Sequence, residues 1–130
     1  MGKYGKAAEI AVDLVAKGNS LAPRDAWKKA VARVFPQSPS SQAKGCPRDS
    51  FLALCELGIV KNVAPGTYTR SVKNKTYIAR ALAALRSTPA LLDDEKRLWH
   101  IATDGANTVA NCQMEVLTAL WRQRLIRHGL

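Results

Sequence analysis

Acidic residues are scarce in this sequence and missing from its middle. The chain of 130 residues has 20 Lys and Arg against 10 Asp and Glu, a formal charge of +10. Neither Asp nor Glu occurs between Glu56 and Asp93, while this interval carries six cationic side chains. A basic domain of this kind favours an anionic partner, with nucleic acid the first candidate. The same charges also keep a small protein soluble, and that interpretation stays open.

Long apolar runs and secretion signals are also missing. No stretch approaches the roughly 20 apolar residues that a membrane-spanning helix needs. Glu9 and Asp13 interrupt the apolar residues behind the basic N-terminus, so we expect neither a signal peptide nor a membrane partner. The three cysteines form an odd set without a CxxC pair. Reduced thiols and a cytoplasmic location are therefore expected.

Motifs for cofactors and metals are absent. The sequence has no Walker loop and no GxGxxG segment, which leaves nucleotide binding without a motif. Its two His and three Cys show none of the usual zinc-ligand spacings. We expect no cofactor and no metal site.

One catalytic arrangement can be drawn from the few nucleophilic residues. Cys46 stands at a predicted helix start beside Arg48, two features that activate a thiol. His100 would be its base, and Asp104, four residues further on, would orient the imidazole. A small buried Cys46 and a merely polar His100 are the simpler interpretation, because such sites are identified by geometry. We therefore predict a protein that is not an enzyme.

Apolar residues recur with the periodicity of helices. Alternating Val, Ile, Thr and aromatic runs are lacking, whereas apolar residues three and four positions apart recur along the chain. Together with Pro and Gly at the expected boundaries, this spacing predicts main helices over 3–17, 21–35, 47–58, 71–86 and 107–127. It also predicts a helical segment from Asp93 or Asp94 to about 103, and short helical turns over 38–44 and after Pro89. The sequence thus predicts one all-α domain over 1–130, an orthogonal bundle of five main helices plus one or two short ones.

Two parts of this pattern carry further expectations. The longest loop, 61–70, contains Pro65-Gly66, which is typical of a type II turn. The last predicted helix, 107–127, has apolar residues beyond a single stripe, including Val109 and Leu120. Such a helix is either central in the bundle or shared with a second copy of the chain. The central position is the preferred interpretation, and a homodimer through residues 107–127 is the alternative.

Several short stretches make the sequence similar to a known family. It resembles a family of small bacterial proteins of unknown function in the following segments: Lys3-Tyr4-Gly5-Lys6-Ala7-Ala8, Pro23-Arg24-Asp25-Ala26-Trp27, Phe35-Pro36-Gln37-Ser38-Pro39-Ser40-Ser41-Gln42, Gly45-Cys46-Pro47, Phe51-Leu52-Ala53-Leu54-Cys55, Pro65-Gly66-Thr67-Tyr68-Thr69 and Ala119-Leu120-Trp121. These segments are caps and core positions, and they span most of the chain. The resemblance implies a single domain and implies no activity.

The acid-free middle of the chain supplies the candidate binding residues. On the helix predicted after Ser71, Lys73, Tyr77 and Arg80 share one stripe beside the apolar face. A helix start with a basic stripe suits the backbone of DNA or RNA, and Tyr77 and Tyr68 could stack on unpaired bases. The full candidate set is Lys61, Arg70, Lys73, Lys75, Tyr77, Arg80 and Arg86, with Arg122, Arg124 and Arg127 as a second patch. No pair of predicted helices matches a helix-turn-helix, so non-specific backbone contact is expected. A protein-interaction or oligomerising module with an incidental basic surface is the alternative.

Overall fold

The computed structural model describes residues 2–17 and 21–127. Within these residues the chain forms α-helices joined by loops, and the predicted all-α class is confirmed. The longer helices are α1 (Lys3–Ala16), α2 (Pro23–Val34), α4 (Gly45–Glu56), α5 (Val72–Ser87), α6 (Glu95–Ala102) and α7 (Gln113–Arg122); α3 (Pro39–Gln42) and the 3-10 helix η1 (Pro89–Asp93) are short. None of the helices in the described ranges is long and apolar enough to cross a membrane.

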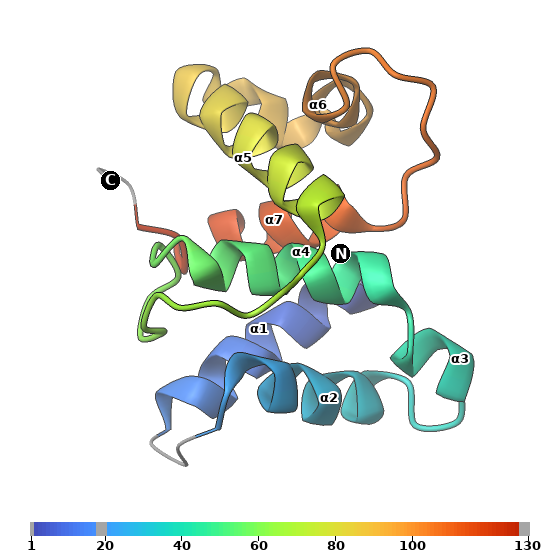
Figure 1. The fold of residues 1–130 in the computed structure, drawn as a ribbon, viewed down its shortest axis with the longest axis vertical. Coiled ribbons are helices and arrows are strands. Elements are labelled where there is room, and N and C mark those ends of the chain that lie inside the picture. Colours follow the sequence, from blue (N-terminus) through green and yellow to red (C-terminus); the bar gives the residue numbers. More distant parts are fainter. Residues whose placement is uncertain (1, 18–20, 128–130) are drawn as a thin grey trace.

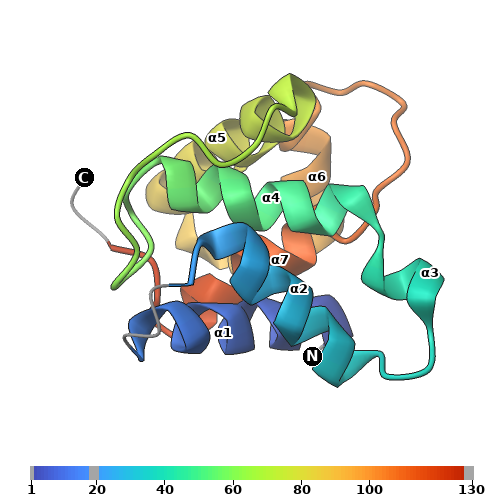
Figure 2. The ribbon, with the colours of Figure 1, turned by 60° about the horizontal axis from the view of Figure 1, so that its bottom comes forward.

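The helices lie in three tiers. The pair α1 and α2 forms one tier, α4 and α7 the middle one, and α5 and α6 the third (Figures 1 and 2). The middle tier is the most buried, because Phe51 and Leu54 of α4 and Leu117 and Leu120 of α7 have no exposed surface. The hydrophobic effect therefore holds the outer pairs against α4 and α7.

Helix boundaries follow local capping chemistry. The side chains of Ser38, Ser71 and Asp94 each accept a hydrogen bond from the backbone amide three residues ahead, at the starts of α3, α5 and α6. The chain leaves α4 at Gly58, whose φ of 72° is left-handed and costs little without a Cβ. The residues directly after it, Ile59 and Val60, are buried. The predicted starts of α3, α5 and α6 and the predicted end of α4 are confirmed to within two residues.

The last helix is shorter than the 107–127 that the sequence predicts. Residues 103–112 form a loop, which the Trp99 indole holds against α6 by donating to the Thr108 carbonyl at 2.8 Å. Residues 106–111 include β-branched and Asn residues, which are weak helix formers. At the other end, Arg124 takes a φ of 59°, and the following backbone pairs with the segment after α4. Tertiary hydrogen bonds there replace the last helical turn.

The predicted type II turn at Pro65-Gly66 is wrong. A type II turn needs a positive φ at its third residue, and among the described residues Gly66 is not one of the glycines with positive φ. A Cβ on Gly66 would instead lie 2.9 Å from Cζ of Tyr68, whose hydroxyl donates to the Ala64 carbonyl at 2.6 Å. Glycine is needed at this position because the tyrosine ring folds back over it.

Candidate nucleic-acid interface

Glu56 anchors the loop that leads into α5. Its Oε1 accepts the backbone amides of Tyr68 at 2.7 Å and Thr69 at 2.9 Å, and its Oε2 lies 3.1 Å from Nζ of Lys75. Burial by itself would raise the pKa of this carboxyl. The hydrogen bonds from the Thr69 and Tyr68 amides and the Lys75 ammonium outweigh that effect and hold the pKa of Glu56 below its ordinary value. The ionised carboxylate is therefore a structural part of the loop.

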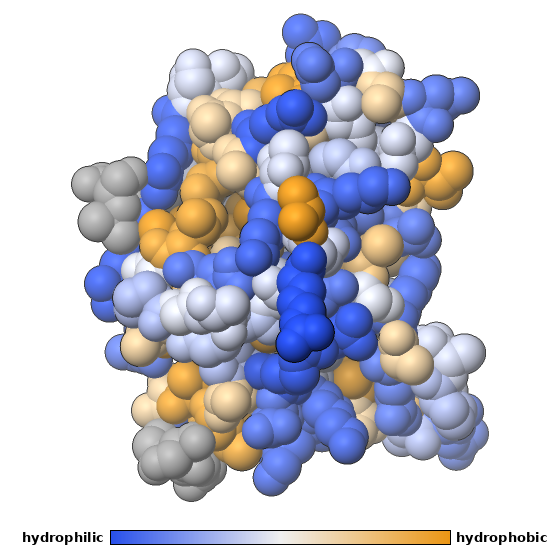
Figure 3. All heavy atoms as spheres, in the orientation of Figure 1, coloured by the Kyte–Doolittle hydropathy of each residue, from blue (hydrophilic) through white to orange (hydrophobic). Residues whose placement is uncertain are grey.

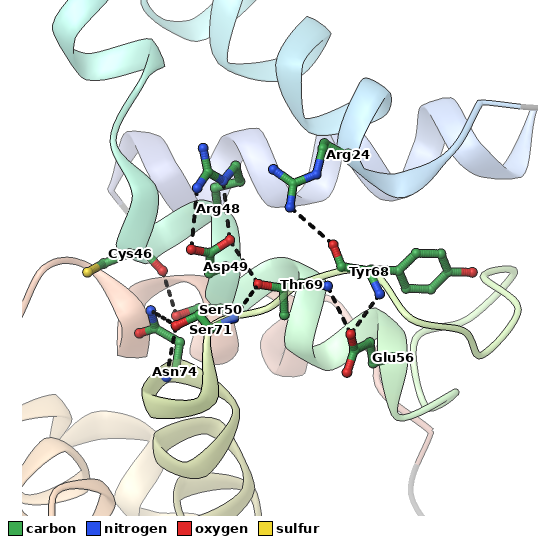
Figure 4. A network of polar contacts seen from close by, with 10 residues as sticks. All are labelled: Arg24, Cys46, Arg48, Asp49, Ser50, Glu56, Tyr68, Thr69, Ser71 and Asn74. Carbon is green, nitrogen blue, oxygen red and sulfur yellow. Dashed lines mark hydrogen bonds and ion pairs between the residues drawn. The ribbon is translucent and has the colours of Figure 1, made fainter.

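A second carboxylate holds the same loop. Asp49 lies two helical turns before Glu56 on the same face of α4, and its Oδ1 accepts the Thr69 hydroxyl at 3.0 Å (Figure 4). The buried Thr69 in turn accepts the Ser71 amide at 3.2 Å. These bonds fix the position at which the chain enters α5.

The start of α5 is electrically uncompensated. Ser71 caps the helix by accepting both the amide and the side-chain Nδ2 of Asn74. The first turn of α5 contains no acidic residue, although acids normally stabilise that end of a helix. The partial positive charge of the helix start therefore adds to the charges of Arg70 and Lys73, both exposed.

A cleft of about 420 Å³ opens beside this helix start. We call it the arginine cleft, and its lining residues are Arg24, Arg48, Asp49, Thr67, Tyr68, Thr69, Arg70 and Ser71. The three guanidinium groups come from α2, from α4 and from the loop before α5, and Asp49 is the one carboxylate in the lining. The cleft is therefore cationic and rich in hydroxyl groups.

The guanidinium groups keep unused hydrogen-bond donors. Arg24 donates one bond, from Nη2 to the Tyr68 carbonyl at 3.2 Å, and Arg48 donates to Asp49 from Nε at 3.2 Å and from Nη2 at 3.4 Å. Figure 4 shows these two side chains next to each other above the strand-like segment around Thr69. Within the ranges described, Arg70 has neither a hydrogen bond nor an ion pair from its side chain. Each guanidinium has five N–H donors, so the cleft presents several to a ligand.

The surface around the cleft is polar. In Figure 3, hydrophilic side chains cover much of the middle of the face, over α4 and toward α2, with a hydrophobic group among them. The first residue of α5, Val72, is 73% exposed.

The structure separates the cations that the sequence places on α5. Lys75 turns toward α4, where it pairs with Glu56, whereas Arg80 donates to the Ala102 carbonyl of α6 at 3.3 Å. Arg86 lies in the last turn, at the far end from the cleft. Of the predicted residues on and before α5, Arg70 lines the arginine cleft. Lys73 is outside the lining, in the first turn of α5 and two residues after Ser71.

The two tyrosines have intramolecular roles. Tyr77 is half-buried and packs edge-on against Trp99, with ring centroids 5.1 Å apart. Tyr68 lines the cleft, but its ring points along the loop, away from Arg24 and Arg48 (Figure 4). Stacking of bases on these rings stays a prediction that would require them to leave these contacts.

The second predicted patch is divided. An antiparallel bridge joins Val60 to Ile126, with the Lys61 amide donating to the Leu125 carbonyl at 2.9 Å. This pairing brings the exposed residues Lys61, Arg124 and Arg127 to one end of the molecule. Arg122 points elsewhere, since its Nη2 lies 3.0 Å from Asp93 and donates to the Leu92 carbonyl at 2.8 Å.

The residues of the possible thiol triad lie on different helices. Cys46 is in the first turn of α4, where its carbonyl accepts the Ser50 hydroxyl at 2.8 Å. His100 is exposed on α6, and its ring lies against Gly105. In the described part of the chain no hydrogen bond joins Cys46, His100 or Asp104 through their side chains. The geometry therefore adds nothing in favour of a triad.

The apolar residues of the last helix are used within the chain. Met114, Val116, Leu117 and Leu120 of α7 are all buried against the other helices, in agreement with a central position. Val109 remains 79% exposed, on the loop before α7. A homodimer through residues 107–127 stays a prediction. Its apolar contact would come from the loop that carries Val109, because the apolar residues of α7 named above are buried within the chain.

Sequence reasoning missed Arg24 and Arg48. Both sit near the start of a helix, on α2 and α4, where a cation opposes the helix dipole. That local mismatch was the one signal in the sequence. Their meeting with Arg70 depends on how the tiers pack, which the sequence pattern does not encode.

Comparison with known proteins finds one family model that covers residues 1–127 of the 130. The model of a family of unknown function (DUF6979) matches residues 1–127. No curated protein and no solved structure matches the chain.

Proposed function

Because the chain belongs to this family of unknown function, we propose from its own geometry that it is a non-enzymatic protein that binds the phosphate backbone of a nucleic acid. The binding surface is the arginine cleft with the start of α5. Its cationic members are Arg24, Arg48, Arg70 and Lys73.

The convergence of three guanidinium groups on one cleft is the observation that carries the proposal. Two of them, Arg24 and Arg48, come from different helices and share the cleft with Arg70, and Asp49 is the one carboxylate in its lining. Like charges that line one cleft repel one another, and an anion between them relieves the repulsion. Planar guanidinium groups bind phosphate with two parallel hydrogen bonds.

The surroundings of the cleft suit a phosphate chain. Hydroxyl groups of Thr67 and Ser71 line it, and hydroxyls are common donors to nucleic-acid phosphates. The uncompensated start of α5 adds backbone N–H groups with partial positive charge. With an open rim and a formal charge of +10 on the whole chain, the cleft can follow a backbone rather than enclose a single ion.

Binding should depend steeply on salt. Four phosphate contacts predict a slope of about −3 for the logarithm of the binding constant of a single strand against the logarithm of salt concentration. We expect the double variant Arg70→Glu with Lys73→Glu to reduce affinity at least about tenfold and to flatten this slope to about −1.5. Glu at position 73 also favours the helix dipole, so the fold should be retained.

The matched control changes the same charge away from the cleft. Arg86→Glu with Lys96→Glu alters two exposed cations at the end of α5 and on α6. It should change affinity less than about threefold at moderate salt, where distant charges are screened. If both double variants lose affinity equally, binding depends only on the net charge of the chain, and the cleft is not the binding site. If mixed-sequence DNA and RNA both fail to bind the wild type at low salt, the proposal is wrong and the interaction-module alternative is favoured.

A further inference from the structure

A second hollow lies directly beside the arginine cleft. It has a volume of about 360 Å³ and shares Arg24 and Arg48 with the cleft. We call it the side groove. Its other lining residues include Trp27, Val31, Pro39 and Ala43. The two guanidinium groups therefore form a rim between a polar cleft and a mostly apolar groove.

The chemistry of the side groove differs from that of its neighbour. The exposed residues Pro39 and Ala43 offer methyl and methylene surface, and the buried Val31 also lines the groove. Lys28 and the two arginines supply positive charge. A groove of a few hundred Å³ with apolar walls and a few polar groups is typical of sites that hold a ring-sized ligand. Arginine planes also stack on nucleobases.

A buried donor at the groove has no partner. Trp27 is 2% exposed, and its ring stacks on Phe51 with centroids 5.3 Å apart. Its Nε1 has no hydrogen-bond partner among the described residues. Unpaired buried donors are rare in proteins, and this one belongs to a residue of the groove lining.

We propose that the side groove takes an unstacked base of a single-stranded nucleic acid whose phosphates lie in the arginine cleft. The inference rests on the proposed function and names its ligand class. In a duplex the bases are paired and stacked inside, so their rings cannot enter a side groove without being flipped out. A single strand can place a phosphate and a base on the two sides of Arg24 and Arg48 at once. Charge complementarity favours this occupant over an apolar peptide, because the charged residues in the groove lining, Arg24, Lys28 and Arg48, are all cationic.

The experiment compares four probes by fluorescence anisotropy. They are a mixed-sequence single strand of about 12 nucleotides, its duplex, an abasic strand of the same length, and inorganic polyphosphate as competitor. One stacked base should make the single strand bind about 5- to 100-fold more tightly than the abasic strand. The affinity for the duplex, divided by its number of phosphates, should be similar to that for the abasic strand.

One variant fills the side groove without changing charge. Ala43 is exposed at the C-terminal end of α3 and lines the groove. Ala43→Leu should lower the affinity for the single strand to that for the abasic strand and leave competition by polyphosphate unchanged. Ala83→Leu is the matched control, since Ala83 is exposed on α5 and lies outside the groove.

The outcomes separate this inference from the proposed function. If the single and abasic strands bind alike, or if Ala43→Leu behaves like Ala83→Leu, the base site is overturned while backbone binding stands. Poly-glutamate is also tested as a competitor of the single strand. If it displaces the strand from the wild type but not from Ala43→Leu, the groove binds an acidic peptide and the base site is overturned. If no probe binds at low salt, backbone binding fails, and the base site fails with it.

Discussion

Replacement of Glu56 tests whether a fixed loop or mere positive charge makes the binding surface. Glu56→Ala leaves the amides of Tyr68 and Thr69 without their acceptor and Lys75 without its partner. A buried donor without a partner costs about 1–3 kcal/mol. Thr69 is 3% exposed and Tyr68 is half-buried, so the second amide can recover water. The half-exposed ion pair adds less than about 1 kcal/mol.

These contributions predict that Glu56→Ala lowers the free energy of unfolding by about 1–4 kcal/mol. Glu56→Gln keeps an oxygen that can accept both amides and loses only the charge. We therefore expect it to lower the free energy of unfolding by about 1–2 kcal/mol. Urea unfolding followed by far-UV circular dichroism at pH 7 measures both values. Hydrogen exchange at the amides of Tyr68 and Thr69 should accelerate in the same order. Asp13→Asn makes the same charge change at a surface ion pair with Lys17 and should cost less than about 0.5 kcal/mol.

Nucleic-acid binding by Glu56→Gln then separates the two explanations. The substitution raises the net charge by one, so a charge-driven interaction would become tighter. A surface that depends on the fixed loop before Arg70 would bind more weakly. Stronger binding, or a loss of stability in Glu56→Ala no larger than that in Asp13→Asn, would refute the role given to this carboxylate.

Three further predictions concern stability and local geometry. Since the pKa of Glu56 is lowered on folding, its contribution is present above the unfolded pKa of about 4.3 and disappears as the pH falls through the folded value. The stability difference between wild type and Glu56→Gln should therefore shrink below about pH 4 in acid-titrated urea curves. Glu115→Gln weakens the bond that the Gly5 amide donates at 2.9 Å near the start of α1, and thermal unfolding should show a loss of about 1 kcal/mol. Gly66→Ala should displace the Tyr68 ring and cost about 1 kcal/mol, with changed ring shifts in the proton NMR spectrum.

Local chemistry made most helix boundaries predictable. Ser71 and Asp94 cap the helices that follow them, and Gly58 ends α4, because each acts on backbone groups within four residues of itself. Apolar spacing of three and four identified the buried faces of the helices for the same reason. The error over 107–127 has two causes. Residues 106–111 are weak helix formers, and at the other end pairing with the distant Ile59–Lys61 segment ends the helix early.

The candidate site shows the same division. Sequence pattern identified the acid-free interval and, within it, Arg70 and Lys73. It could not show that Lys75 and Arg80 turn to opposite neighbours, because helical spacing defines directions around one axis and says nothing of which helix packs there.

The sequence by itself determined that the chain is a basic, all-α domain and where most of its helices start. Those properties depend on composition and on interactions between residues close along the chain. The meeting of Arg24 and Arg48 with Arg70 was decided by the tertiary structure alone. Burial of the faces of α4 and α7 sets how the three tiers stack, and only that stacking brings side chains from distant segments to one cleft.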